Sequence, residues 1–273
     1  GMIKSTIFEQ FCGGETIEEC TTTIESMWKH HVGTILDYSV EGKTSAEDFE
    51  ATTKEIIATI HKGKGNPAIP FAVFKVTGIA RFSLLELTNS GLEGISEADL
   101  KEYHETVERV NRICKEAYDA AVPVFIDAEE TWIQDVIDRI CHEMILKYNK
   151  ERAIVFNTVQ MYRHDRLEFL KNSIAWAKAE GVQYGVKLVR GAYMEKERNR
   201  AAEKGYPSPI QPSKETCDSD YDRALEFLVE PENFQQMALC AGSHNEDSSA
   251  FLADLIDKKG IALLKELDHD GDK

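Results

Sequence analysis

Two charged side chains lie in or after apolar runs of the sequence, where burial would require a partner. Lys75 lies within PFAVFKVTG (70–78), and Asp127 belongs to the next apolar run, VPVFIDAE (122–129). Neighbouring strands of a sheet lie about 4.8 Å apart, so these side chains could meet if the runs are adjacent strands. A buried ion pair costs desolvation and is usually functional or strongly hydrogen-bonded. A strand-end lysine that reaches solvent is the alternative interpretation, and the residues alone leave it open.

The segment VKLVRGAY (186–193) brings two cations, two small residues and an aromatic ring to one strand end. Lys187 and Arg190 have opposite parity on a regular strand, so only one can face inward, and we expect it to be Lys187. Gly191-Ala192 lets the backbone approach a ligand closely. Tyr193 offers a flat apolar face with a polar tip. The combination suits an anionic or electron-rich flat ligand.

Four further polar residues are weaker candidates for ligand binding. The Gln160 amide both donates and accepts hydrogen bonds, which suits the edge of a heterocyclic ring, although a buried Gln bonded to the backbone is equally common. His244 and Asn245 end the last apolar run, where they could contact a nucleotide, but a lone His is more often structural. Lys214 could meet a phosphate or simply be solvated.

Several familiar site motifs are missing from the sequence. There is no GxGxxG after an apolar run and no GxxxxGK[ST], so neither a Rossmann nor a P-loop site is expected. The six cysteines include no CxxC pair, so we expect reduced thiols in a cytosol-like compartment and neither a disulfide framework nor a metal site.

The elements that must position these residues follow a regular alternation. Apolar, partly β-branched runs typical of strands buried on both faces occupy 33–40, 70–78, 122–129, 153–162, 184–192 and 237–244. Amphipathic stretches separate them. A capping box at 16–19 and capping serines at Ser45 and Ser96 predict helix starts, and 164–180 has helical periodicity. The alternation predicts one α/β domain over residues 1–260, followed by an acidic tail at 261–273.

The position of the polar residues favours one of two α/β architectures. A doubly wound sheet and a TIM-type (β/α)8 barrel both fit the alternation. Polar side chains stand at or just after the C-terminal end of every run, as on the catalytic face of a barrel, whereas a doubly wound sheet needs them only near one switch point. We therefore expect a barrel in which this chain supplies about six of eight strands.

Composition restricts the partners. The 273 residues carry a formal net charge of −16, which argues against nucleic acid and against electrostatic docking on anionic membranes. No apolar run is long enough for a membrane helix, and the given sequence shows no basic-then-apolar pattern at its start, so we expect neither a membrane span nor a signal peptide.

Taken together, these segments resemble the proline dehydrogenase family. The resemblance runs from about residue 8 to about residue 250 and rests, in the family's order, on FCGGETIEEC, FKVTG, VPVFIDAEET, NTVQMY, VKLVRGAYMEKE, YPSPIQPSKETCDSDYDRAL and SHNEDS. It is similar to the monofunctional type, which has no aldehyde dehydrogenase domain. The family fold is a (β/α)8 barrel that binds FAD at the C-terminal ends of its strands, in agreement with the ring of polar residues.

The resemblance implies a role for each candidate. Lys75 and Asp127 would be paired charges beneath substrate and flavin, Tyr193 would pack at the active site, and Lys187 would lie near flavin N5. The resemblance further implies FAD contacts from Gln160, Arg190, Gly191, Ala192, Lys214, Cys217, His244 and Asn245. Cys217 stands where members often have a hydroxyl residue. The family's C-terminal Tyr-x-x-Arg-Arg motif, which clamps the proline carboxylate, is not found after residue 245.

The expected activity is therefore FAD-dependent oxidation of L-proline to Δ1-pyrroline-5-carboxylate, the first step of proline catabolism to glutamate. A hydride would pass to flavin N5 and the electrons to a membrane quinone. The expected location is cytoplasmic or peripheral at the inner membrane. Two alternatives remain: a shortened, non-catalytic barrel fragment, and a flavin-free barrel enzyme that forms a Schiff base on Lys75.

Overall fold

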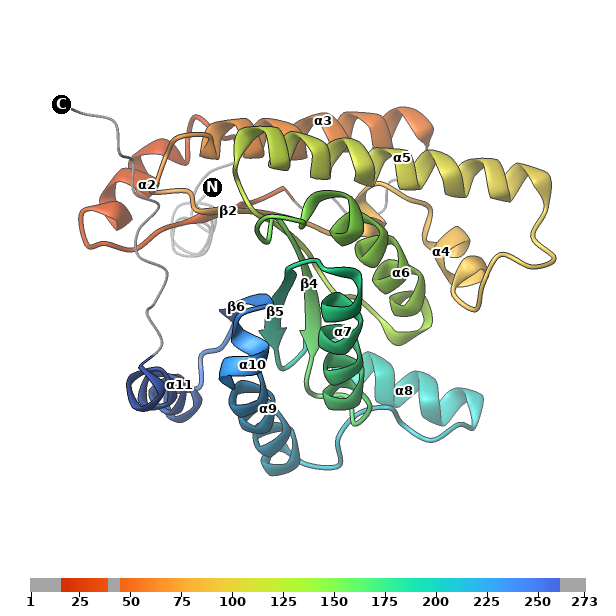
Figure 1. Cartoon of the computed structure of the whole chain (residues 1–273). Coiled ribbons are helices and arrows are strands. Elements are labelled where there is room, and N and C mark those ends of the chain that lie inside the picture. Colours follow the sequence, from red (N-terminus) through yellow and green to blue (C-terminus); the bar gives the residue numbers. More distant parts are fainter. Residues whose placement is uncertain (1–15, 39–44, 261–273) are drawn as a thin grey trace, which may run out of the picture. The chain divides into compact units, whose positions relative to one another are not determined.

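The chain forms an α/β fold built on parallel strands (Figure 1). The computed structural model describes residues 16–38 and 45–260. Its six described strands follow one another in the order β1-β2-β3-β4-β5-β6, and the pairs β1–β2, β2–β3, β3–β4 and β5–β6 are parallel. The predicted alternation and six strands are thus confirmed. Over the described residues the order has two ends, so an eight-stranded closed ring stays a prediction. The chain divides into two compact units, 1–158 and 159–273.

The strands of the first unit are shorter than the apolar runs that predicted them. They are β1 (Ile35–Asp37), β2 (Phe71–Phe74), β3 (Val124–Ile126) and the start of β4 (Val155–Gln160). β3 and β4 are buried at every residue, as two-faced burial predicts. β1 differs: Ile35 is 44% exposed, and among the described strands β1 pairs with β2 alone. The prediction of two-faced burial was therefore wrong for this run.

Three aromatic rings from neighbouring strands form part of the core of this unit. Phe71 and Phe125 stack with ring centroids 4.5 Å apart. Phe156 meets both of them edge-on, at 5.7 and 5.4 Å. Each such aromatic pair contributes about 0.5–1.5 kcal/mol beyond its buried area. Because the rings come from β2, β3 and β4, they help to fix the order and register of these strands.

Five helices complete the described part of the first unit. They are α2 (Thr21–Trp28), α3 (Ala46–Gly63), α4 (Phe82–Thr88), α5 (Glu97–Ala120) and α6 (Thr131–Tyr148), and α3 and α5 lie side by side (Figure 1). Ser45 and Ser96 cap α3 and α5 as predicted. Thr16 accepts the Glu19 N–H at 3.2 Å, but the helix begins only at Thr21. The capping box was therefore placed about one turn too early.

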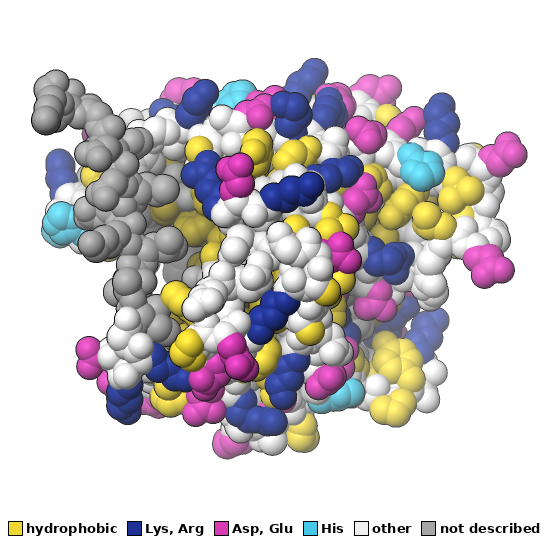
Figure 2. Space-filling model, in the orientation of Figure 1, with side chains coloured by type: hydrophobic (Ala, Val, Ile, Leu, Met, Phe, Trp, Pro, Cys, Tyr) yellow, Lys and Arg dark blue, Asp and Glu magenta, His cyan; other side chains and the backbone are white. Residues whose placement is uncertain are grey.

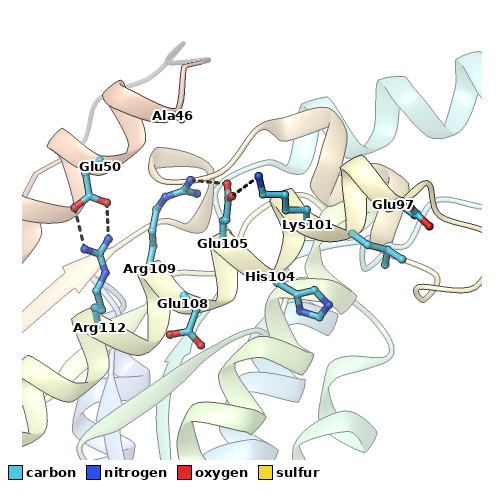
Figure 3. Close-up of a pocket in the computed structure, with 10 residues that line it drawn as sticks. Ala46, Glu50, Glu97, Lys101, His104, Glu105, Glu108, Arg109 and Arg112 are labelled. Atoms are coloured by element: carbon cyan, nitrogen blue, oxygen red, sulfur yellow. Dashed lines mark hydrogen bonds and ion pairs between the residues drawn. The ribbon is translucent and has the colours of Figure 1, made fainter.

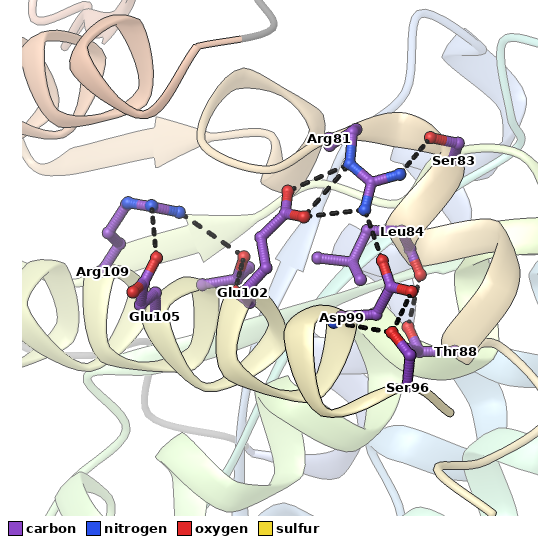
Figure 4. Close-up of polar contacts among 10 residues, drawn as sticks. Arg81, Ser83, Leu84, Thr88, Ser96, Asp99, Glu102, Glu105 and Arg109 are labelled. Carbon is purple, nitrogen blue, oxygen red and sulfur yellow. Dashed lines mark hydrogen bonds and ion pairs between the residues drawn. The ribbon is translucent and has the colours of Figure 1, made fainter. Parts of the chain in front are cut away.

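A polar cluster ties the start of α5 to the start of α4 (Figure 4). The Ser96 hydroxyl donates to Asp99 at 2.7 Å, and Asp99 accepts a hydrogen bond from Arg81 at 2.8 Å. Arg81 also donates to both carboxylate oxygens of Glu102. A single guanidinium thus joins the residue before α4 to the first turns of α5.

The second unit, as far as residue 260, contains the end of β4, β5 (Tyr184–Val189), β6 (Met237–Ala241) and five helices. The predicted helix at 164–180 is α7 (Arg166–Glu180). The charged, proline-containing segment after Tyr193 folds into α8 (Met194–Lys204) and α9 (Lys214–Leu228), and α9 begins with a capping box on Ser213. A short α10 (Pro231–Phe234) leads into β6, and α11 (Glu246–Lys259) follows it. The predicted tail at 261–273 lies outside the described residues.

Figure 2 shows acidic and basic side chains interspersed on the visible face, with hydrophobic side chains scattered between them. Across 16–38 and 45–260, no helix combines the length and the hydropathy that crossing a membrane requires.

Candidate active site

Lys75 and Asp127 form the ion pair that the sequence predicts. Lys75 directly follows β2 and Asp127 directly follows β3, and the Lys75 Nζ lies 3.3 Å from Asp127 Oδ2. The side chains are only 29% and 16% exposed. A second carboxylate, Asp37 at the end of β1, has its Oδ2 3.9 Å from the same Nζ. The C-terminal ends of three neighbouring strands thus place one cation and two carboxylates together.

The charges around Lys75 determine its protonation. Burial by itself would lower the pKa of the Lys75 ammonium, but the Asp127 and Asp37 carboxylates outweigh this effect and raise the pKa above its ordinary value. Lys75 is therefore a stable cation. A Schiff-base enzyme needs a neutral lysine, so this geometry disfavours the flavin-free alternative.

A second pair of side chains continues the same strand register. Thr77 donates its backbone N–H to Glu129 Oε1 at 3.1 Å, and its hydroxyl bonds to Glu129 Oε2. Glu129 is 3% exposed, and burial raises the pKa of its carboxyl group to about 7. Sequence reasoning did not select Glu129, although the polar ends of the apolar runs were a signal that included it.

The remaining predicted residues belong to the second unit, where Gln160 and Lys187 occupy strand positions. Gln160 is the last residue of β4 and is 2% exposed. Lys187 is half-buried within β5, in register with Cys240 of β6. Lys187 and Val189 are more exposed than Leu188 between them, as the alternation of a strand predicts, and the inward orientation of Lys187 stays a prediction.

Arg190 is bonded to protein groups through all three guanidinium nitrogens. Nε donates to Asp218 at 2.6 Å, Nη1 to Ser243 at 2.7 Å and Nη2 to Ser248 at 2.9 Å. The guanidinium also lies over the Tyr221 ring, 4.3 Å from its centroid. Burial raises the pKa of Tyr221 to about 12, so this ring stays neutral. Arg190 therefore joins the end of β5 to α9 and to the start of α11.

The Tyr162 ring restricts which residue can follow Arg190. Gly191 has φ +135°, and a Cβ there would lie 2.6 Å from the Tyr162 ring, so only glycine fits. The predicted close approach at Gly191 thus exists, and the neighbour is an aromatic side chain of the same unit. Ala192 is exposed, and the half-buried Tyr193 directly precedes α8.

The last four predicted residues lie around α9 and the start of α11. Lys214 is 71% exposed and pairs with Asp218. Cys217 is buried in an apolar cluster with Tyr162 and Ile210, and burial raises the pKa of its thiol. His244 is exposed, whereas Asn245 accepts the Ser248 N–H at 3.1 Å and so caps α11. Their roles toward a cofactor stay predictions.

Sequence reasoning missed several partners of the predicted residues. Asp37, Thr77 and Tyr162 belong to the polar strand ends, so their signal was present. Asp218, Tyr221, Ser243 and Ser248 reach Arg190 from distant segments, and no local pattern marks them.

Residues of α3 and α5 line a pocket (Figure 3), and none of the predicted site residues is among them. The pocket volume is about 820 Å³, and surface ion pairs such as Glu50–Arg112 line it. Within the described ranges, no group of three or more His, Cys, Asp or Glu side chains could hold a metal ion.

Comparison with solved structures defines the fold class. The chain superposes on proline utilization A (PutA) from Bdellovibrio bacteriovorus with a TM-score of 0.82 and 20% identity, covering 96% of this chain and 28% of that one. PutA from Corynebacterium freiburgense gives a TM-score of 0.73 and 17% identity, over 88% of this chain and 24% of that one. The molecule is therefore an α/β protein with the fold of a segment of PutA.

Sequence comparison then gives the family. The family model "Proline dehydrogenase" matches residues 20–265, and the chain belongs to this family. It is 30% identical to "Proline dehydrogenase 1, mitochondrial" of Dictyostelium discoideum over 90% of this chain, and 29% identical to the protein of the same name in Arabidopsis thaliana over 91%. The chain spans 50% and 58% of the length of these two relatives.

Proposed function

We propose that this chain carries the catalytic core of an FAD-dependent proline dehydrogenase, which oxidises L-proline to Δ1-pyrroline-5-carboxylate. The observation that carries the proposal is the ion pair between Lys75 and Asp127 at the ends of neighbouring strands, in a chain of this family. The surrounding carboxylates keep Lys75 charged, so the pair offers a cation and an anion that can orient a small zwitterionic amino acid.

The donor groups of the second unit fit a flavin. Gln160 supplies a buried amide that matches the donor and acceptor edge of a pyrimidine ring, and Lys187 supplies a half-buried cation for a ring that becomes anionic on reduction. When bound, FAD would supply the two-electron acceptor for the substrate hydride. The protein would bind both partners, exclude water and place the Lys187 side chain near the ring.

The other residues implied by the family have supporting roles. Arg190 would fix the loop that carries His244 and Asn245 through its bond to Ser243. Gly191 and Ala192 would leave room for the cofactor, Tyr193 would pack beside the substrate, and Lys214 and Cys217 would flank the ribityl or phosphate part. A membrane quinone would take the electrons onward. The cytoplasmic location stays a prediction, and relatives named as mitochondrial do not support it.

The absorption spectrum of the purified chain tests the proposal. With FAD added, we expect a bound oxidised flavin whose visible band bleaches on addition of L-proline. We also expect proline-dependent reduction of a quinone analogue. Lys75→Met should lower turnover by roughly 100-fold, because it removes the positioning cation.

Lys101→Met is the matched control, since Lys101 is 80% exposed on α5 and should leave turnover unchanged. A protein that binds no FAD leaves the fragment interpretation standing. A flavin that does not bleach with proline contradicts the proposed substrate.

A further inference from the structure

The ends of β2 and β3 are joined by two side-chain pairs that keep one register. The last paired strand residues are Phe74 and Ile126. Lys75 and Asp127 are 52 positions apart, and Thr77 and Glu129 are also 52 apart. The ladder therefore continues beyond the strands through side chains, first as an ion pair and then as a hydroxyl–carboxyl contact.

The hydrogen bonds between Thr77 and Glu129 hold a tight turn that immediately follows Lys75. Lys75 directly precedes the short 3-10 helix η2 (Val76–Gly78), and the Glu129 carboxyl group accepts hydrogen bonds from both the N–H and the hydroxyl of its middle residue, Thr77. Because both carboxyl oxygens are used, the turn cannot rotate without breaking two hydrogen bonds. The backbone at Lys75 is therefore fixed on both sides, by β2 before it and by the hydrogen bonds to Glu129 after it.

Glu129 is itself held in place by a buried polar chain. Its backbone N–H donates to the Gln134 amide oxygen at 2.7 Å. The Gln134 amide nitrogen donates to Asp138 at 2.9 Å, and Asn157 donates to the same Asp138 oxygen at 2.9 Å. All four residues are at most 5% exposed, so the chain runs through the interior from α6 to β4. A rigid support of this kind is what a positioning residue requires.

We propose that Glu129 is a positioning residue for Lys75. Its two hydrogen bonds to Thr77 fix the conformation of the backbone that places the Lys75 ammonium beside Asp127. The inference rests on the proposed function for its kinetic consequence, but the positioning itself is a property of the first unit. The charged groups that act on Glu129 are Lys75 across the strand end and Glu130 beside it in the chain.

Three substitutions separate positioning from charge. Glu129→Gln keeps both bonds, since its oxygen accepts the Thr77 N–H and its amide donates to the Thr77 hydroxyl. Glu129→Ala removes both. Thr77→Val keeps the volume and the backbone bond but removes the hydroxyl bond, and it also serves if the alanine variant does not fold.

The kinetic measurement is the split between kcat and KM for L-proline at several pH values. We expect Glu129→Ala to lower kcat by roughly 10- to 100-fold, because a displaced cation orients the substrate poorly. Thr77→Val should fall between this variant and the wild type. Glu129→Gln should stay within about threefold of the wild type and lose any kinetic pKa near 7. Glu93→Ala, an exposed glutamate in the α4–α5 connection, is the control.

A second measurement does not depend on flavin or on activity. The rate of acylation of Lys75 is followed by peptide mass spectrometry as a function of pH. In the wild type, the Asp127 partner should keep Lys75 slow to react. Glu129→Ala should raise this rate at least threefold, and Glu129→Gln should not, because the ion pair persists only where the turn is held.

The two measurements distinguish a failure of the proposed function from a failure of the positioning role of Glu129. If the wild type does not oxidise proline, the proposed function fails, while Lys75 labelling still decides on the positioning. Equal Lys75 labelling in the wild type, Glu129→Ala and Thr77→Val would overturn the inference. So would a Glu129→Gln variant that is as impaired as Glu129→Ala, because charge rather than geometry would then matter.

Discussion

At the scale of single residues, Glu129 shows how burial sets a charge. The group is almost fully enclosed, and desolvation outweighs the hydrogen bonds from Thr77 and the attraction of Lys75. The resulting pKa of about 7 lies well above the value of about 4.3 for a free glutamate. The folded protein therefore binds a proton at Glu129 more tightly than the unfolded chain does.

This difference predicts a loss of stability with rising pH. Between pH 5 and 8 the ionisation of Glu129 should lower the free energy of unfolding by roughly 2–3 kcal/mol, because the folded state holds the proton and the unfolded state has lost it. Urea unfolding of the wild type and Glu129→Gln at pH 5 and pH 8 measures this effect. As the pH rises, the wild type should lose free energy of unfolding relative to Glu129→Gln, which has no carboxyl group to ionise at this position. A difference that is the same at both pH values would contradict the raised pKa.

The residue scale also shows how far sequence reasoning reaches. Lys75 and Asp127 could be paired from the sequence because each directly follows a strand and the strands are consecutive. The contact between Thr77 and Glu129 follows from the same register, but its recognition requires that the strands end at Phe74 and Ile126. The partners of Arg190 could not be predicted, because Ser243 and Ser248 come from a loop and a helix more than 50 residues away.

At the scale of elements, local sequence signals determine where helices begin, whereas long-range contacts determine how strands and helices pack. Ser45 and Ser96 mark helix starts because a capping hydroxyl acts within three residues of its own position. The pairing of β1 with β2 in the described strand order is a long-range feature, which the sequence of β1 itself does not show. Hydrogen bonds from one long side chain, Arg190, join β5 to α9 and α11.

Replacement of Arg190 should weaken this junction. Arg190→Ala removes three hydrogen bonds and a contact with Tyr221, and we expect a loss of about 2–4 kcal/mol in the free energy of unfolding. Arg190→Lys should lose about half as much, since it keeps the charge but not the planar fork. Hydrogen exchange should speed up at residues 243–248 in both variants.

Arg223→Ala gives the matched control for this junction. Arg223 lies on α9 itself and pairs with Asp220, but its side chain is 58% exposed. Its removal should cost less than about 1 kcal/mol. Equal losses for Arg190→Ala and Arg223→Ala would show that the Arg190 contacts do not hold the junction.

At the scale of the whole molecule, charge sets the solution behaviour. The formal net charge of −16 corresponds to a pI near 5.0, so repulsion between molecules should disappear as the pH falls toward that value. We expect a solubility minimum near pH 5 and high solubility at pH 8. Light scattering at a fixed protein concentration measures this dependence. Solubility that does not change over this range would contradict the charge argument.

The register shared by β2 and β3 also determines where the chain can change its length. One residue inserted after Phe74 would shift Lys75 away from Asp127 and Thr77 away from Glu129 in a single step, and would turn both side chains to the other face. The connection between α4 and α5, at residues 89–96, contains neither strand residues nor members of these pairs. Over evolutionary time, insertions and deletions in this part of the fold should therefore accumulate between the helices and be purged from the few residues that follow each strand.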